Sequence, residues 1–249
     1  MPIKFENKLF FFIVLLVLVA QSCTSIKDAS NLKNPNKVYY YGALKDMMHK
    51  GDISSKFELK KLESQSHVYA LGAMENLKGE IQIFNSESYN SFMKGDSVAM
   101  DKSFTKKATL MVYSIVEHWN SFKIPNSIQT SNELEVFIAK KAHENGLDST
   151  KPFAFLVSGL FTSLDWHVIN WKEGDTEHSH DKHINSGGHG TLKNIHADLL
   201  GFYSNAHHRI FTHHSTNMHI HFKSKNQALA GHVDDLLLGK NLVLLLPKY

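Results

Sequence analysis

The sequence of 249 residues contains a single cysteine and a single arginine, and its formal net charge is only +3 at pH 7. Because Cys23 has no partner, an internal disulfide and a cysteine-rich metal site are both excluded. Guanidinium groups dominate phosphate recognition, so a near-neutral chain whose only arginine is Arg209 is not expected to bind nucleic acid. With 42% apolar residues, the chain can bury a sizeable core and should fold as a compact globular protein.

The N-terminus has the pattern of an export signal. Lys4 and Lys8 come just before an apolar run from Leu9 to Ala20. This run is too short for a membrane-spanning helix, which needs about 20 residues. Residues 1–22 are therefore predicted to be a signal peptide. The Ser22–Cys23 junction resembles a bacterial lipoprotein signal, so we expect a lipidated tether over residues 23–37. This predicts an exported protein, lipid-anchored to a bacterial membrane on its periplasmic or extracellular face.

Hydrophobic patterning predicts a domain over residues 38–249, with an α/β half over about 38–150 and a β half over about 151–249. Strands are expected at 38–41, 68–71, 79–84 and 108–116, and helices at 43–50, near 57–62 and at 131–145. In the second half, strands are expected at 153–157, 166–171, 199–203, 218–222, 236–238 and 242–246. Residues 172–190 are polar and rich in glycine and histidine, so they are predicted to form a loop.

Three histidines near the C-terminus have the spacing of metal ligands. In an extended strand, His219 and His221 point to one side, whereas Met218, Ile220 and Phe222 point to the other. A short loop then lets the chain return and place His232 opposite the pair. Three neutral nitrogen ligands leave a fourth position open, as in catalytic zinc sites. The alternative is chance, because 13 of the 17 histidines lie from His167 onward.

Several segments in order resemble the alpha-acetolactate decarboxylase family. They are Gly42–Leu44 with Gly51–Asp52, Ala70–Gly72, Leu77–Glu80, Leu200–Phe202, Met218–Phe222 and Ala230–Val233. The resemblance implies an N-terminal mixed β-sheet with helices, packed against a C-terminal mostly-β, barrel-like half, with the metal near their junction. It also implies that His219, His221 and His232 bind zinc or another divalent metal, and that Glu80 is the active-site carboxylate. The implied reaction converts a 2-hydroxy-3-oxo acid such as 2-acetolactate to acetoin and carbon dioxide.

The sequence departs from the family pattern at three places. His167 stands where the family carries an arginine, and Ala73 stands where it carries a threonine. The chain also reaches Tyr249 without the second glutamate that the family's C-terminal tail brings toward the metal. We expect His167 to compensate in part as a proton donor if a neighbouring carboxylate raises its pKa, metal binding to survive, and turnover of acetolactate to be weak.

Other histidines leave two alternatives open. The cluster of His178, His180 and His183 is similar to a metallo-β-lactamase zinc signature, but its aspartate is one position early, so the cluster is expected to be solvated. His207, His208, His213 and His214 are expected on the surface or in packing, with the last two near a pocket mouth. A lipoprotein that captures several metal ions without catalysis is one alternative, and a non-catalytic relative that binds a hydroxyketo acid is the other. A homodimer is also left open.

Overall fold

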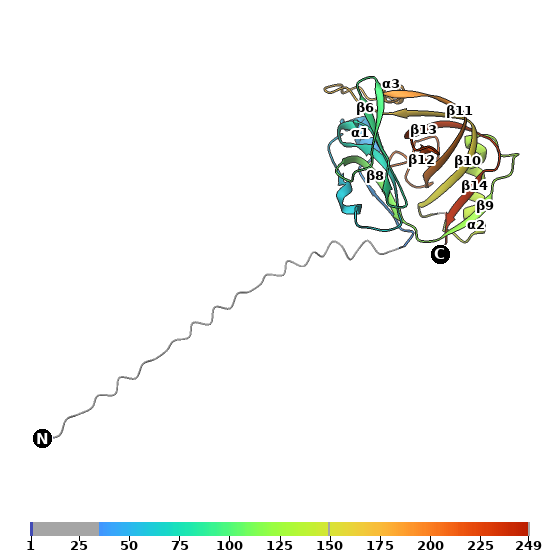
Figure 1. Cartoon of the computed structure of the whole chain (residues 1–249), viewed down its shortest axis with the longest axis horizontal. Coiled ribbons are helices and arrows are strands. Elements are labelled where there is room, and N and C mark those ends of the chain that lie inside the picture. The colour runs from blue at the N-terminus through green and yellow to red at the C-terminus, as the bar shows by residue number, and fades with distance from the viewer. Residues whose placement is uncertain (2–34, 149, 249) are drawn as a thin grey trace. The chain divides into compact units, whose positions relative to one another are not determined.

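The computed structural model describes Met1 and residues 35–148 and 150–248 (Figure 1). The predicted signal peptide, Cys23 and most of the predicted tether lie outside the described residues. The first half contains β1 Val38–Tyr41, α1 Leu44–Lys50, β2 Phe57–Glu58, η2 Leu59–Leu62, β3 Val68–Met74, η3 Glu75–Leu77, β4 Glu80–Phe84, β5 Glu87–Ser88, β6 Asn90–Lys94, β7 Ser97–Asp101 and β8 Lys107–Ile115. The second half contains β9 Trp119–Lys123, α2 Ser131–Glu144, β10 Phe153–Val168, α3 His180–Asn185, β11 Gly188–Tyr203, β12 Met218–Ser224, β13 Ala230–Leu238 and β14 Val243–Pro247.

The described strands form two sheets that face each other. The first sheet has the order β1-β8-β3-β4-β6-β7, with β2 beside β8 and β5 beside β4. The second has the order β11-β12-β13-β10-β14-β9, and an additional pairing of β11 with β10 closes β10 to β13 into a ring. Figure 1 shows the first sheet in blue to green and the ring in yellow to red. The predicted fold class, a mixed sheet with helices against a barrel-like β half, is confirmed.

The chain passes from the first sheet to the second between β8 and β9, whereas the sequence suggested that the two halves of the domain divide near residue 150. Strand β9 pairs with β14 in the second sheet, and α2 packs its apolar side chains into the core of the second sheet. Both elements precede residue 150 in the chain. The region that supports the second sheet therefore begins near Trp119.

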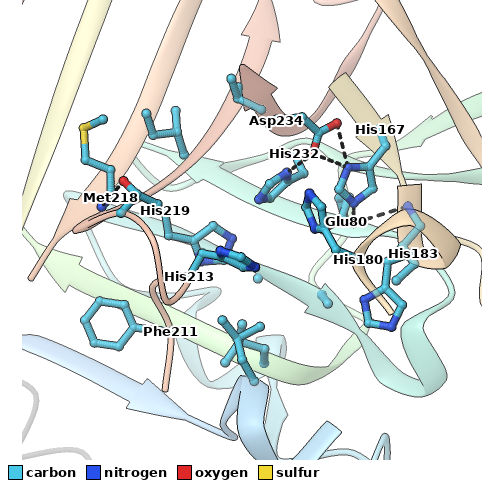
Figure 2. Close-up of a pocket in the computed structure, with 18 of the residues that line it drawn as sticks. Glu80, His167, His180, His183, Phe211, His213, Met218, His219, His232 and Asp234 are labelled. Carbon is cyan, nitrogen blue, oxygen red and sulfur yellow. Dashed lines mark hydrogen bonds and ion pairs between the residues drawn. The ribbon is translucent and has the colours of Figure 1, made fainter. Parts of the chain in front are cut away.

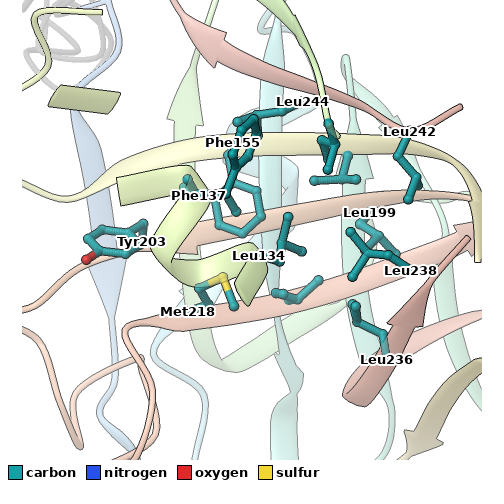
Figure 3. Packing of buried hydrophobic residues seen from close by; sticks show 14 of the residues in the cluster. Leu134, Phe137, Phe155, Leu199, Tyr203, Met218, Leu236, Leu238, Leu242 and Leu244 are labelled. Carbon is teal, nitrogen blue, oxygen red and sulfur yellow. The ribbon is translucent and has the colours of Figure 1, made fainter. Parts of the chain in front are cut away.

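The first five residues of strand β10 are apolar on both faces of the sheet, and a hydrophobic core covers each face. Phe153, Phe155 and Val157 lie in the core inside the second sheet, whereas Ala154 and Leu156 contact the core between the sheets. This alternation is the period of two that a strand imposes. Figure 3 shows Phe155 among leucines from β11, β13 and β14, and all of these side chains are largely shielded from water. The rigid ring thus fixes the strands that carry the candidate site.

Helix α2 forms where a capping box precedes an apolar stripe. The Thr130 side chain accepts a hydrogen bond from the Glu133 backbone, and the Glu133 carboxylate accepts one from the Thr130 backbone. Leu134, Phe137, Ile138 and Ala142 recur at helical spacing and are buried. Gly146 follows with a φ of +76°, which ends the helix as expected.

Three expectations for local structure were wrong or incomplete. Residues 153–157 and 166–171 are not two strands divided by Gly159, because β10 pairs with β11 continuously along nearly all of its length and Gly159 adopts a φ of +148° within it. The predicted loop contains helix α3 and the start of β11. Strands β6, β7 and β9 are short, and each mixes polar with apolar residues, so they lack the longer apolar run on which strand prediction depends. Among the described residues, no helix is long and apolar enough to cross a membrane.

Candidate active site

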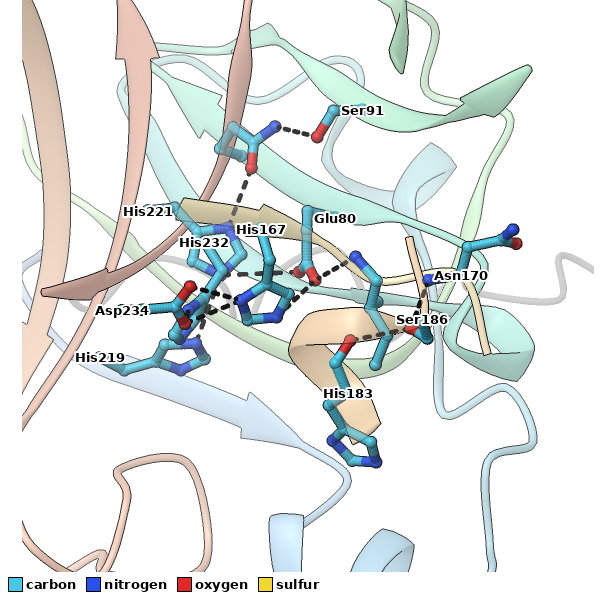
Figure 4. Close-up of polar contacts among 12 residues, drawn as sticks. Glu80, Ser91, His167, Asn170, His183, Ser186, His219, His221, His232 and Asp234 are labelled. Atoms are coloured by element: carbon cyan, nitrogen blue, oxygen red, sulfur yellow. Dashed lines mark hydrogen bonds and ion pairs between the residues drawn. The ribbon is translucent and has the colours of Figure 1, made fainter. Parts of the chain in front are cut away.

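Strands β12 and β13 bring His219, His221 and His232 together. Residues His221 and His232 are direct cross-strand partners, and His219 shares the face of His221 two positions earlier. The three ring centroids are 5.1, 5.2 and 5.4 Å apart. One ligand nitrogen from each ring lies within 4.8 Å of the other two. The spacing predicted a common site for these imidazoles, and the fold brings them to one (Figure 4).

Gln82 determines which nitrogen of His221 carries the proton. The Gln82 amide nitrogen donates to the Tyr89 carbonyl and to Ser91 Oγ, so its oxygen must face the other way. That oxygen lies 2.9 Å from His221 Nδ1. Because an amide oxygen can only accept, Nδ1 is the donor and Nε2 of His221 keeps its lone pair. This is the arrangement that metal-binding histidines usually have.

Asp234 determines which ring nitrogen carries the proton in two further histidines. Its carboxylate lies 2.8 Å from His167 Nδ1 and 3.0 Å from His232 Nδ1. The hydrogen bonds from both rings outweigh burial and hold the pKa of Asp234 below its usual range. An ionised carboxylate only accepts, so both rings donate from Nδ1 and His232 turns Nε2 toward the other two ligands. His167, His232 and Asp234 also form a compact donor cluster, but their hydrogen bonds to one another already satisfy it.

The donor set fits a tetrahedral cation. With zinc–nitrogen bonds of 2.0–2.1 Å, two ligand nitrogens should lie about 3.3 Å apart. The Nε2 atoms of His219 and His221 are 3.3 Å apart. Burial and the neighbouring imidazoles lower the pKa of both side chains well below the usual range, so both are neutral near pH 7. Burial opposes protonation of His232, but the hydrogen bond and charge of Asp234 and the charge of Glu80 raise its pKa, so a cation at this ring competes with protonation.

Glu80 lies beside this trio, on β4 of the first sheet. One carboxyl oxygen accepts a hydrogen bond of 3.2 Å from the Ile169 backbone and lies 3.8 Å from His167 Nε2. The other oxygen lies 3.8 Å from His221 Nε2. Burial raises the pKa of Glu80 to about 8, against the attraction of His232. The two predicted catalytic residues, Glu80 and His167, therefore lie side by side at the junction of the two sheets.

A cavity of about 520 Å³ opens beside these groups (Figure 2). Its lining combines the polar site with apolar side chains such as Met47, Leu77, Phe211 and Met218. Ala73, at the position of the family's threonine, also lines it. No described lysine or arginine does, and Arg209 is exposed elsewhere. The cavity suits a small molecule with an apolar portion and oxygen atoms that can reach a cation.

Sequence reasoning missed Gln82 and Asp234. Each lies two residues from a predicted site residue in a strand, Gln82 after Glu80 and Asp234 after His232, so strand alternation was the signal that could have found them. The cluster of His178, His180 and His183 was expected to be solvated, and His180 is exposed, but two of the three side chains also border the cavity. Helix α3 folds over the cavity, and both His180 and His183 line it.

Among the other histidines, His213 also lines the cavity mouth, whereas its neighbour His214 is exposed and does not. His207 instead packs against Tyr40 and Phe211, as expected of a packing residue. Of the two neighbours in sequence, only His213 is therefore placed to meet a ligand.

Solved structures with the same fold are alpha-acetolactate decarboxylases or resemble them. The enzyme from Bacillus subtilis strain 168 is 17% identical, with a TM-score of 0.69 and 86% of each chain covered. A Staphylococcus aureus protein of unknown function, described as similar to alpha-acetolactate decarboxylase, is 16% identical, with a TM-score of 0.69 and 86% of each chain covered. A comparison with curated protein sequences finds no significant match.

The fold is thus that of a decarboxylase whose two sheets meet at a histidine-rich cavity. The alpha-acetolactate decarboxylase family model matches residues 38–245. This chain belongs to the alpha-acetolactate decarboxylase family, and the predicted family resemblance is confirmed. Membership implies a carboxy-lyase that acts on a small molecule.

Proposed function

We propose that this chain is a metal-dependent carboxy-lyase that converts a 2-hydroxy-3-oxo acid, such as 2-acetolactate, to acetoin and carbon dioxide. His219, His221 and His232 would hold one divalent cation, with zinc as the first candidate. The observation that carries the proposal is the convergence of three imidazole nitrogens, two of them with lone pairs fixed by Gln82 and Asp234, beside a buried carboxyl group.

Decarboxylation leaves an electron pair that must be stabilised. When bound, the cation supplies a Lewis acid that polarises the substrate's keto oxygen. The protein contributes a water-poor site, because Glu80 and His221 are 4% and 0% exposed. In such a site each charge interaction is stronger than in water, which favours the transition state in which charge develops.

Glu80 supplies the proton that completes the product. Loss of carbon dioxide leaves the electron pair at the former carboxyl-bearing carbon, and one proton must reach it to give the hydroxyketone. With its pKa raised to about 8, the Glu80 carboxyl holds a proton near neutral pH in the metal-free protein. The Ile169 backbone N–H fixes the orientation of this carboxyl, and His167, whose pKa burial lowers, lies beside it at 3.8 Å without a hydrogen bond.

The test is release of carbon dioxide and acetoin from 2-acetolactate by the zinc-loaded protein. The two products should form in equal amounts, and His219→Ala should abolish both. His189→Ala is a matched control, because His189 is exposed and lies outside the cavity. A protein that binds one ion per chain and releases no carbon dioxide would instead support the non-catalytic relative.

Export and lipid attachment at Cys23 complete the proposal, and the sequence around Ser22 and Cys23 supports them. Labelled palmitate should enter the full chain when it is expressed in a bacterium, and Cys23→Ser should remove the label. A homodimer stays a prediction, which sedimentation of the purified protein would check.

A further inference from the structure

No described side chain that lines the cavity carries a permanent positive charge that could receive an acidic substrate. Neither lysine nor arginine is among the described lining residues. His167, at the position of the family's arginine, donates to Asp234 at 2.8 Å and faces Glu80 at 3.8 Å. A substrate carboxylate placed there would approach two other carboxyl groups. The anion therefore requires a different partner.

Two imidazoles at the cavity mouth are free of carboxylate partners. His180 comes from helix α3 and His213 from the loop after Phe211, and their ring centroids are 5.2 Å apart. Figure 2 shows both side chains at the cavity, His213 toward His219 and His180 toward His232. Both line the same cavity as Glu80. Only the fold brings these two residues together, since 32 residues lie between them in the sequence.

The hydrogen bonding of the pair leaves donors for a ligand. His213 Nδ1 lies 3.0 Å from Ser215 Oγ, and the serine hydroxyl can donate to it, which leaves the Nε2–H of His213 directed elsewhere. The His180 side chain makes no hydrogen bond within the part of the chain that the structure describes, and its ring packs against the ring of His213. Burial and the imidazoles of His214 and His180 lower the pKa of His213. A neutral imidazole still donates one N–H.

A second metal ion is a weaker explanation of the pair. Two compact donor clusters occur among the described residues, and neither includes His180 or His213. His214, the nearest third imidazole to His213, is exposed and does not line the cavity. Two ligands without a third do not make a typical structural or catalytic zinc site. Hydrogen bonding to an anion remains the role that the geometry supports.

We propose that His180 and His213 form the carboxylate-binding pair of this chain, donating N–H groups to the substrate's carboxylate while its other oxygens face the histidine trio. This inference rests on the proposed function, because it names the part of the site that selects an acid. A neutral amide of the same shape would keep one acceptor oxygen but would lose the charge and the second oxygen.

The test compares two ligands that cannot be decarboxylated. 2,3-Dihydroxy-2-methylbutanoate keeps the carboxylate, and 2,3-dihydroxy-2-methylbutanamide keeps the two hydroxyl groups but carries no charge. Binding of each to the zinc-loaded full chain is measured by calorimetry. His180→Phe and His213→Phe keep a ring without N–H groups, and His214→Phe is the matched control. Zinc stoichiometry verifies that each variant keeps its metal site.

Each single variant should bind the acid about tenfold or more weakly, since a hydrogen bond to a charged group is lost. Each variant should lose several-fold less affinity for the amide, because the amide keeps one acceptor oxygen but no charge, and His214→Phe should change neither affinity. Equal loss for acid and amide, or unchanged affinity for the acid, would overturn the proposal, as would failure of the unsubstituted chain to bind the acid. Release of carbon dioxide from 2-acetolactate is scored separately, so an inactive protein that still prefers the acid through this pair would refute only the proposed reaction.

Discussion

Gln82 should control metal affinity although it cannot touch the metal. In Gln82→Met, His221 loses the acceptor that lies 2.9 Å from its Nδ1. The ring can then carry its proton on Nε2, directed at His219 Nε2 3.3 Å away. Binding of zinc forces that proton back to Nδ1, where the Gln82 oxygen is no longer present to accept it. Both side chains are 0% exposed, so water cannot replace the lost oxygen.

The cost follows from the unsatisfied buried donor. Leaving such an N–H without a partner costs about 1–3 kcal/mol, which corresponds to a zinc affinity weaker by about 5-fold to 150-fold. Substitution of similar outer partners elsewhere lowers metal affinity by about 10-fold to 100-fold. Competition with a chromophoric chelator measures the dissociation constant, with circular dichroism as the check on folding.

Ser91→Ala is the matched control for this experiment. It removes one of the two acceptors of the Gln82 amide but leaves the Tyr89 carbonyl, so the oxygen of Gln82 still faces His221. We expect its zinc affinity to stay within about fivefold of the unsubstituted chain, since a single neutral hydrogen bond is worth about 1 kcal/mol or less. If Gln82→Met binds zinc as tightly as Ser91→Ala does, the argument from the proton's position is refuted.

Glu80→Gln should lower turnover of 2-acetolactate by about 100-fold or more while one zinc ion still binds, and loss of zinc instead would give Glu80 a structural role. In the metal-free protein, the Glu80 pKa of about 8 against 4.5 unfolded means that the folded chain binds more protons between these values. The contribution of Glu80 to stability therefore falls as pH rises through this window. The unfolding temperature of Glu80→Gln, followed against pH, should lack this fall. Parallel pH profiles of the unsubstituted chain and Glu80→Gln would contradict the raised pKa. Leu134→Ala, at a side chain 0% exposed, should cost about 2–5 kcal/mol of unfolding free energy in urea, whereas Val136→Ala, 70% exposed on the same helix, should cost less than about 0.5 kcal/mol. Equal costs would show that α2 does not pack as described.

The sequence predicted what short-range periodicity controls. Alternation placed His219 and His221 on one face and Met218, Ile220 and Phe222 in the core, where the structure has them. Helix α2 followed from its apolar stripe and from Gly146. The closed ring was predictable only as a barrel-like half, because the pairing of β10 with β11, β13 and β14 is a long-range choice that local pattern does not encode.

The environment of the site could not be predicted in the same way. Asp234 contacts His167 across strands, and Gln82 reaches His221 from another sheet, so their roles depend on registers that only the fold fixes. Helix α3 is short and polar, and nothing in its sequence indicates that it covers a cavity. Arg209, the only arginine, is exposed and is not among the residues that line the cavity.

The most direct measurement is a titration of zinc into the metal-free protein while carbon dioxide release from 2-acetolactate is followed. The account predicts no release without metal, a linear rise as zinc is added, and a plateau at one ion per chain. Release that is independent of zinc, a plateau that needs several ions, or no release at any zinc concentration would contradict a single catalytic cation held by His219, His221 and His232.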